Sequence, residues 1–303
     1  MKNRITIVGD GNVGSSIALT LLLKEFGDEI VLIDKNQGKA KADSLDLLQA
    51  SVLLHHPVLV RPGDETDYRD STFIILTAAA GSTSGVNDRL LMLEPTRKIL
   101  SGILDSIRGS GFNGYLIVVS NPVDVMTYYA YKKTGLSRSQ VIGTGTLLDT
   151  ARLVSAISEE KKVPASDIVD GMMLGEHGKT SAGIFSNVFF YGKEESISFS
   201  DAEKEAIVSK TNDAGWEIVS GKGNTSYGIA ASVYRICHSI YYNENCLLPV
   251  SQVDEEGSVA YSLPRILNRK GIDRTVEFSL SEEEKKELDH SIEALKEVCR
   301  RLS

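Results

Sequence analysis

A glycine-rich turn between a strand pattern and a helix pattern constrains this chain more than any other feature. Residues 5–8 are the apolar run Ile-Thr-Ile-Val, the next six residues match Gly-x-Gly-x-x-Gly, and a helical pattern follows to about residue 26. A second apolar run, residues 29–34, ends on Asp34. The glycine pattern alone is weak. Between two strands, at the start of a helix and followed by an acid, it predicts a dinucleotide-binding unit.

Each glycine of this turn has its own task. Gly9 permits the tight turn, Gly11 lets the backbone approach a pyrophosphate, and Gly14 lets the helix pack on the strand. The amino end of the helix then faces the anion. Asp34 can accept hydrogen bonds from ribose hydroxyls and would repel a 2′-phosphate, which favours NAD over NADP, although Lys35 beside it weakens that preference. The alternative, a turn with no ligand, does not explain Asp34. The cofactor residues predicted here are Gly9, Gly11, Asn12, Val13, Gly14 and Asp34.

The first half of the chain continues this alternation of strands and helices. Further apolar runs at residues 58–61, 72–77 and 115–119 are separated by helical stretches. Such runs are typical of a parallel sheet that helices cover on both faces, because parallel neighbours need crossover connections. We therefore expect an α/β protein whose first domain, residues 1–142, is a Rossmann-type doubly wound parallel sheet that binds NAD.

The second half has a different pattern and predicts an α+β substrate domain in residues 143–303. One helix is expected at residues 201–220, with Ile207, Thr211, Ala214 and Ile218 on one stripe. A C-terminal helix is expected after a capping box that Ser281 and Glu284 form. The other expected elements are a helix that follows the Gly-Thr-Gly-Thr turn of residues 143–146 and runs to residue 161, and extended segments at 168–174, 246–253 and 259–266.

Bulk composition excludes several classes of protein. The 303 residues suit more than one domain, and a net charge of −8 without a basic run disfavours a nucleic-acid partner. No apolar run approaches the ~20 residues of a membrane helix. The strand pattern at the N-terminus leaves no room for a signal peptide, and the scattered Cys237, Cys246 and Cys299 indicate neither disulfides nor a metal site. We expect a cytoplasmic protein without a metal.

Three groups further along the chain carry candidate chemistry. His177 lies between glycines in Gly-Glu-His-Gly, directly after an extended run, where active sites often lie. Asp149 and Arg152 are three apart on a predicted helix and so share a face. They are either a surface ion pair or a site in which the arginine clamps a carboxylate and the aspartate orients a histidine. Arg89 ends a small, polar, glycine-bearing segment that suits a mobile lid, or simply a solvated loop.

Taken together, these segments resemble the L-lactate/L-2-hydroxyisocaproate dehydrogenase family, which is related to malate dehydrogenases. The resemblance runs from the glycine turn to the C-terminal helix, and the order of the segments is more specific than any one of them. The segments that carry it are residues 9–14, 77–89, 120–124, 143–152, 174–178, 221–226 and 267–271.

The resemblance implies roles for individual residues. His177 matches the acid/base that protonates the carbonyl oxygen, Asp149 its buried partner, Arg152 the substrate carboxylate clamp, and Arg89 the lid arginine that polarises the carbonyl. Asn121 matches an asparagine beside the reacting oxygen and cofactor, in an Asn-Pro bond that is cis in relatives. The remaining implied residues are Thr225, Ser82 and Gly215 at the substrate, and Thr77 and Ala78 at the cofactor. Cationic donors suit this reaction because carbonyl reduction develops negative charge on oxygen.

The implied substrate is a small 2-oxo or 2-hydroxy acid. Lactate-specific relatives carry glutamine where this chain has Ser82, and Gly215 is a very small wall residue, so we expect a pocket for side chains larger than methyl. Plain L-lactate dehydrogenase is the alternative, since hydroxyisocaproate relatives have a longer lid. A malate enzyme would need a second cation on the lid, where Asp88 has the wrong sign. A catalytically dead NAD-binding protein should have lost one of the four polar groups, and a metal-dependent glycosidase would need metal ligands.

The resemblance also bears on assembly and regulation. Relatives form dimers and tetramers through the helices after Asp34 and after Thr225, so we expect a homo-oligomer, with a tetramer favoured. Many bacterial relatives are activated by fructose 1,6-bisphosphate, held by an arginine and a histidine whose places are taken here by Val154 and Asp170. A phosphate would find no donor and one repelling charge, so no activation is expected.

Overall fold

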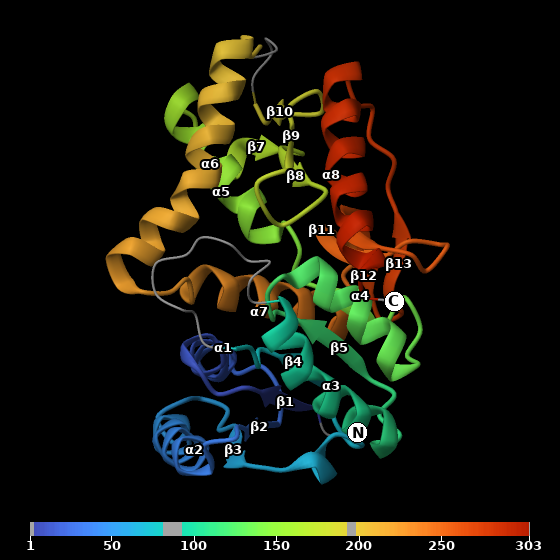
Figure 1. Cartoon of the computed structure of the whole chain (residues 1–303). Coiled ribbons are helices and arrows are strands. Elements are labelled where there is room, and N and C mark those ends of the chain that lie inside the picture. Colours follow the sequence, from blue (N-terminus) through green and yellow to red (C-terminus); the bar gives the residue numbers. More distant parts are fainter. Residues whose placement is uncertain (1–2, 81–92, 193–197, 303) are drawn as a thin grey trace.

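A mixed sheet forms the centre of the molecule (Figure 1). The computed structural model describes residues 3–80, 93–192 and 198–302. Within these ranges, nine strands form one sheet in the order β13-β12-β11-β6-β5-β4-β1-β2-β3. From β3 to β6 all neighbours are parallel, which confirms the predicted Rossmann-type sheet. These strands are β1 (Arg4–Val8), β2 (Glu29–Ile33), β3 (Leu59–Pro62), β4 (Phe73–Leu76), β5 (Tyr115–Val118) and β6 (Val141–Gly143).

Helices cover both faces of the parallel strands, and alternate strand residues face opposite cores. In β4, Phe73 and Ile75 join one buried cluster while Ile74 and Leu76 join another, and all four are fully buried. This is why the strands appear as unbroken apolar runs. The first cluster includes side chains of α1 (Asn12–Leu23), α2 (Gln37–Ser51) and α7 (Tyr227–Tyr241); the second includes those of α3 (Leu93–Ser110), α4 (Val123–Thr134) and α8 (Glu282–Arg300).

The second half of the chain adds an antiparallel extension to the same sheet. β11 (Cys246–Val253), β12 (Ala260–Asn268) and β13 (Gly271–Thr275) form a meander that joins β6 where Ser251 pairs with Gly143. The remaining elements lie beyond this meander (Figure 1). They are the helices α5 (Leu147–Lys161) and α6 (Asp201–Lys222), the strand pairs β7 (Ile168–Val169) with β10 (Phe189–Phe190) and β8 (Met172–Leu174) with β9 (Ala182–Ile184), and the short helix η3 (Ala165–Asp167). The other short helix, η1 (Glu65–Asp67), lies between β3 and β4 in the first half of the chain.

Several sequence predictions need correction. The strand β6, which ends at Gly143, was not predicted, whereas α5 begins at Leu147, directly after the Gly-Thr-Gly-Thr turn, as expected. The expected extended run at 168–174 is two strands of different sheets, because Asp170 takes a positive φ of 60° and turns the chain between them. The predicted stripe of α6 holds at its start, where Ile207 is buried, but Ile218 is 39 % exposed because the distal part of the helix projects from the body (Figure 1).

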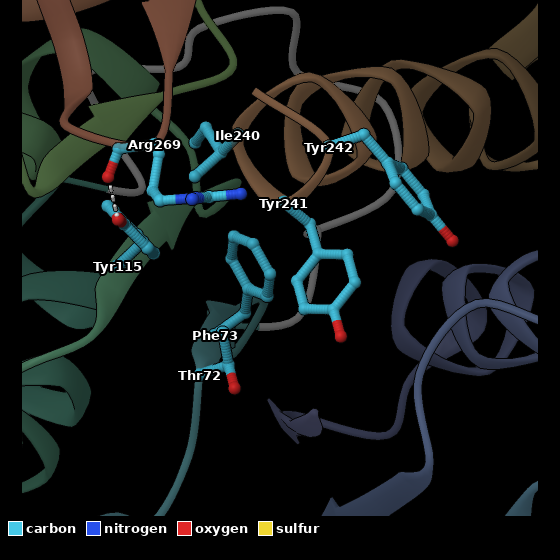
Figure 2. Close-up of a pocket in the computed structure, with 7 residues that line it drawn as sticks. All are labelled: Thr72, Phe73, Tyr115, Ile240, Tyr241, Tyr242 and Arg269. Carbon is cyan, nitrogen blue, oxygen red and sulfur yellow. Dashed lines mark hydrogen bonds between the residues drawn. The ribbon is translucent and has the colours of Figure 1, made fainter. Parts of the chain in front are cut away.

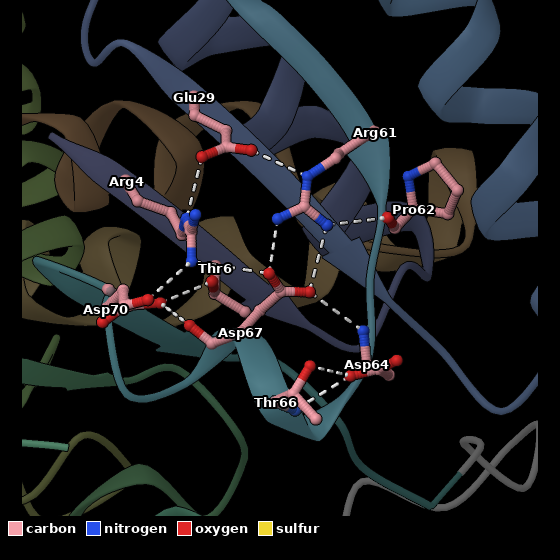
Figure 3. A network of polar contacts seen from close by, with 10 residues as sticks. Arg4, Thr6, Glu29, Arg61, Pro62, Asp64, Thr66, Asp67 and Asp70 are labelled. Atoms are coloured by element: carbon pink, nitrogen blue, oxygen red, sulfur yellow. Dashed lines mark hydrogen bonds and ion pairs between the residues drawn. The ribbon is translucent and has the colours of Figure 1, made fainter. Parts of the chain in front are cut away.

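A network of ion pairs ties the amino ends of the parallel strands together (Figure 3). Glu29 accepts hydrogen bonds from Arg4 Nε at 2.8 Å and Arg61 Nε at 2.7 Å, and Arg61 also pairs with Asp67. Burial raises the pKa of Glu29, but the two guanidinium groups outweigh it and hold that pKa below its usual value. This end of the sheet is therefore stabilised by structural charges, and the chemistry lies at the other end.

Candidate active site

The glycine turn packs directly on the end of the neighbouring strand. Gly9 has a φ of 107°, and a Cβ there would lie 2.7 Å from Ala78 Cα. A Cβ on Gly14 would overlap the Gly9 carbonyl oxygen. Thr77 Oγ1 donates a hydrogen bond to that same oxygen at 2.5 Å. The first and third glycines of the pattern are therefore required by close backbone approach, as the sequence predicted.

The start of α1 fits a bound anion. The helix begins after Gly11, whose position offers no side-chain cap, and its first turn holds no acidic residue. Among the described residues, no atom lies within 4 Å of a Cβ built on Gly11, so the described part of the chain leaves room beside the start of the helix. Such uncapped N–H groups at a helix start suit a phosphate. The residues present thus fit the pyrophosphate of NAD.

Asp34 is held by backbone groups around this turn. Its Oδ2 accepts from the Asp10 N–H at 2.7 Å and its Oδ1 from the Asn36 N–H at 2.8 Å. The carboxylate lies at the end of β2, half-buried, with acceptor capacity left for ribose hydroxyls. Lys39 Nζ lies 3.3 Å from Asp10 Oδ2, so the nearest lysine to the turn is already paired with a carboxylate.

The carboxyl ends of β4 and β5 bring further predicted residues to the same edge. Ser120 Oγ donates to the Ala78 carbonyl at 2.7 Å, which links the two loops. Asn121 follows β5 and is exposed, and the Asn121-Pro122 peptide bond is cis, which confirms that expectation. Ligands of open α/β sheets bind beyond the carboxyl ends of the strands, so Asn121 lies where the cofactor and substrate would meet.

His177, Asp149 and Arg152 form one continuous polar chain. The two α5 residues are linked by Arg152 Nη1 and Asp149 Oδ1 at 2.7 Å, and the other oxygen of Asp149 hydrogen-bonds His177 Nδ1. All three side chains are nearly buried, with exposed fractions of 13 %, 11 % and 16 % for Arg152, Asp149 and His177. An ordinary surface ion pair is therefore excluded, and the arrangement matches a histidine that a buried carboxylate orients.

The guanidinium of Arg152 keeps donors for a further anion. Its Nε is buried without a hydrogen-bond partner among the described residues. A Cβ built on Gly215 of α6 would lie 3.3 Å from Arg152 Nη1, so Gly215 lies against this group. Thr225 lies between the end of α6 and the start of α7. The predicted Arg89 and Ser82 lie outside the described residues.

One residue of the site was missed in the sequence. Asp124, at the start of α4, accepts a hydrogen bond from the backbone N–H of His177 at 2.7 Å. It is 2 % exposed, and burial raises its pKa to about 6, although Ser251 and His177 act to lower it. Asp124 follows Asn121-Pro122 in a segment already singled out, but no local signal indicates a contact with a residue 53 positions away.

One cavity of the molecule lies away from the candidate active site (Figure 2). Its volume is 480 Å³, and it is lined by Thr72, Phe73, Tyr115, Ile240, Tyr241, Tyr242 and Arg269. Thr72, Phe73 and Tyr115 stand at the amino ends of β4 and β5, opposite the edge that holds Thr77 and Asn121. This cavity is therefore separate from the predicted cofactor site.

The described residues offer neither a metal site nor a membrane span. No group of His, Cys, Asp and Glu there has the arrangement of a metal site. In the same part of the chain, no helix combines the length and apolar character needed to cross a bilayer.

Comparison with known proteins agrees with this geometry over nearly the whole chain. Residues 3–143 match the lactate/malate dehydrogenase NAD binding domain, and residues 146–302 match the alpha/beta C-terminal domain of the same family. The chain is 37% identical over 300 residues to an L-lactate dehydrogenase of Halalkalibacterium halodurans, covering 98% of this chain and 96% of that one. It is also 37% identical over 305 residues to L-lactate dehydrogenase 2 of Staphylococcus aureus strain Newman, with 97% and 95% covered.

Solved structures show the same likeness. The minor L-lactate dehydrogenase from Enterococcus mundtii superposes with a TM-score of 0.93 at 32% identity, covering 100% of this chain and 99% of that one. A lactate dehydrogenase from a Medee basin deep-sea metagenome gives 0.90 at 34% identity, with 98% of each chain covered. The chain therefore belongs to the lactate/malate dehydrogenase family and is an NAD-dependent oxidoreductase of the lactate type.

Proposed function

We propose that this enzyme reduces 2-oxo acids to L-2-hydroxy acids reversibly, with His177 as acid/base, and that it favours side chains larger than methyl. The observation that supports the proposal most is the buried chain of contacts His177–Asp149–Arg152, which joins the residues we assign as acid/base and carboxylate clamp. Relatives named L-lactate dehydrogenase support the reaction class.

The roles follow from the contacts. Arg152 would bind the substrate carboxylate through the donors that Asp149 leaves available. Because Asp149 holds His177 Nδ1, the proton would pass between His177 Nε2 and the carbonyl oxygen. NADH, when bound, supplies the hydride to the second carbon. Asn121 would lie beside the reacting oxygen, and Asp149 would favour the imidazolium that protonates a 2-oxo acid. The roles of Arg89, Ser82 and Thr225 stay predictions from the family resemblance.

The size preference rests on Gly215. It lies directly against the Arg152 guanidinium and contributes no side chain of its own there. A branched or aromatic substrate side chain therefore gains room, and a methylene in such a pocket contributes ~1 kcal/mol to discrimination. The second candidate is a plain L-lactate dehydrogenase, which the names of the relatives favour.

Steady-state kinetics with NADH and pyruvate, 2-oxoisocaproate or phenylpyruvate decide between these candidates. We expect a higher kcat/KM on at least one of the larger acids than on pyruvate. A kcat/KM that is highest on pyruvate by about tenfold or more would establish the second candidate instead.

We also propose a homo-oligomer, with a tetramer as the favoured state. On α2, Leu45 is 56 % exposed and Leu48 lies one turn further on the same face, and Val52, directly after the helix, is 74 % exposed. The neighbouring α1 exposes Leu19 and Leu23, four residues apart. An apolar surface of this kind is rare on a monomer, and α2, which follows Asp34, is one of the two helices that the family resemblance implies for assembly. Light scattering at micromolar concentration that returned the monomer mass would contradict this.

Regulation, location and domain limits complete the proposal. The Val154 side chain, which packs into a hydrophobic cluster, and the carboxylate of half-buried Asp170 have no donor for a sugar bisphosphate. We therefore expect no change of KM on adding fructose 1,6-bisphosphate.

A cytoplasmic location is proposed from the scattered cysteines. We propose the division into residues 1–142 and 143–303, although the sheet itself runs across that point through Gly143 and Ser251.

A further inference from the structure

A single buried carboxylate connects the two halves of the proposed catalytic site. Asp124 belongs to α4, which follows the cis Asn121-Pro122 bond in the first half of the chain. His177 lies in the loop after β8 in the second half. The 2.7 Å hydrogen bond from the His177 N–H to Asp124 Oδ2 spans 53 residues of sequence. The two residues that would face the substrate carbonyl, Asn121 and His177, are thus linked by one side chain.

Other hydrogen bonds also fix the loop around His177. Gly175 pairs with Ser262 of β12 through two backbone hydrogen bonds of 2.9 Å, and the Glu176 N–H donates to Ser291 Oγ of α8 at 2.8 Å. At His177 itself, Asp124 holds the backbone and Asp149 holds the ring. Asp149 can set the orientation of the imidazole ring, whereas Asp124 sets the position of the His177 backbone.

We propose that Asp124 is a positioning residue for the reaction, which holds the backbone of His177 in register with Asn121 and keeps a second negative charge near the imidazole. This rests on the proposed function of His177. Asp124 does not touch the substrate. A misplacement of about 1 Å at the reacting groups can cost ~10²-fold in rate, so a single hydrogen bond at this point has a large expected effect.

The charges around Asp124 agree with this role. His177 and Glu176 face it from the loop, Ser251 from β11 and Cys299 from α8. Burial raises its pKa to about 6, with hydrogen bonds and the His177 charge acting the other way, so the carboxyl is mostly ionised at pH 7.5. Burying an ionised carboxylate costs free energy in the folded state. Its hydrogen bond to the backbone of His177, the proposed acid/base, is a functional reason for the residue to be kept.

The test compares Asp124→Asn and Asp124→Ala with a matched control. Alanine removes the acceptor and the charge, so we expect kcat to fall ~10²-fold with the NADH Kd within about twofold of wild type. Asparagine keeps an acceptor, so we expect a smaller loss, about tenfold. In both variants the alkaline limb of the kcat/KM profile for the 2-oxo acid should move to lower pH, because the charge that favours imidazolium is gone.

Glu284→Gln is the control. Glu284 is also a buried carboxylate that accepts backbone N–H groups, from Phe185 at 2.7 Å and Ser186 at 2.9 Å, but it does not contact the His177 loop. It should lose thermal stability while kcat and the pH profile stay as in wild type. A kcat of Asp124→Ala within about threefold of wild type, or an equal kcat loss in Glu284→Gln at equal loss of Tm, would overturn the proposal.

A measurement on the wild-type protein keeps the proposal testable if the Asp124 variants do not fold. The chain has 5 histidines, so ¹⁵N-histidine labelling gives few amide signals, and His177→Asn identifies the relevant one. We expect the His177 amide proton to resist solvent exchange far longer than an exposed loop amide. Fast exchange of this amide would refute the hydrogen bond to Asp124. Undiminished turnover of His177→Asn would instead refute the proposed function, and the exchange result would still report on the hydrogen bond.

Discussion

The cofactor edge and the catalytic edge of this molecule are built in opposite ways. The NAD turn uses backbone: Gly9 and Gly14 allow close approach, and the described part of the chain leaves room beside the start of α1. The catalytic group uses side chains from separate elements, with Asp149 on α5 contacting His177 in the loop after β8. A backbone site is specified by neighbours in sequence, whereas a side-chain site exists only once distant elements have packed.

This contrast predicts different consequences of mutation. A change in the side-chain site should remove turnover and leave the fold and the binding of NADH intact. A change in the backbone site should alter binding, or the fold, or both, according to whether the added atoms meet protein or open space. The following variants test that separation, from the largest expected effect to the smallest.

Replacing the acid/base should have the largest effect. His177→Asn is expected to lower kcat by ~10²–10⁴-fold, because general acid–base help is lost. NADH binding, measured by fluorescence, should stay near wild type, since His177 lies in the second half of the chain, away from the glycine turn. A folded variant with nearly normal kcat would show that the side-chain site is not the catalytic one.

Two glycines of the turn form a matched pair. Gly14→Ala places a Cβ on the Gly9 carbonyl oxygen, so we expect a loss of roughly 2–3 kcal/mol in the free energy of unfolding together with weaker NADH binding. Gly11→Ala places a Cβ where no atom of the described residues lies within 4 Å, so the Tm should not fall while the NADH Kd rises about tenfold. Unchanged NADH binding in Gly11→Ala would contradict the assignment of that space to the pyrophosphate.

Asp10→Asn tests the buried charge inside the turn. Burial raises the pKa of Asp10 to about 6 from a usual value of 3.8, although Lys39 acts to lower it. The native state therefore takes up this proton more readily than the unfolded chain, so the contribution of Asp10 to stability falls as pH rises from about 4 to about 6. Urea unfolding should show the variant gaining about 2 kcal/mol on wild type across that window. A difference that is constant with pH would contradict it.

Gly215→Ala should have the smallest effect and acts on selectivity. The new Cβ would lie 3.3 Å from Arg152 Nη1 and narrow the wall of the proposed pocket. We expect kcat/KM to fall about fivefold more on phenylpyruvate than on pyruvate, the equivalent of ~1 kcal/mol. Equal losses on the two acids would place Gly215 outside the side-chain pocket.

The same contrast explains what could be predicted from the sequence. The strands and glycine turn of the first half were predicted because each carries its own local signal, and every residue of β4 is buried. β6 was missed because it is three residues long and runs directly into a helix segment, and β13 because it follows β12 after a short turn. Asp170 broke an expected single strand through a positive φ that no apolar pattern reveals.

In the candidate site, too, local sequence signals predicted some contacts, whereas contacts between distant elements were harder to predict. Asp34 was predicted as a cofactor residue from its place after the second strand, and it lies against the turn through Asp10. Asp149 and Arg152 share a helix face, so their contact also follows from spacing. The contact of Asp149 with a histidine was one of two readings of the residues, and only the family resemblance assigned it to His177. The contact of Asp124 was not expected, because both contacts depend on how α4 and α5 pack against the loop after β8.

The most direct test of the central claim follows the hydrogen itself. Wild-type enzyme is given NADH deuterated at the transferable position of its nicotinamide ring, together with 2-oxoisocaproate, and the product is examined by mass spectrometry, NMR and chiral chromatography. Hydride transfer at this site predicts an L-2-hydroxy acid that carries one deuterium at its second carbon in every molecule. A product without deuterium, or one of D or mixed configuration, would contradict the account.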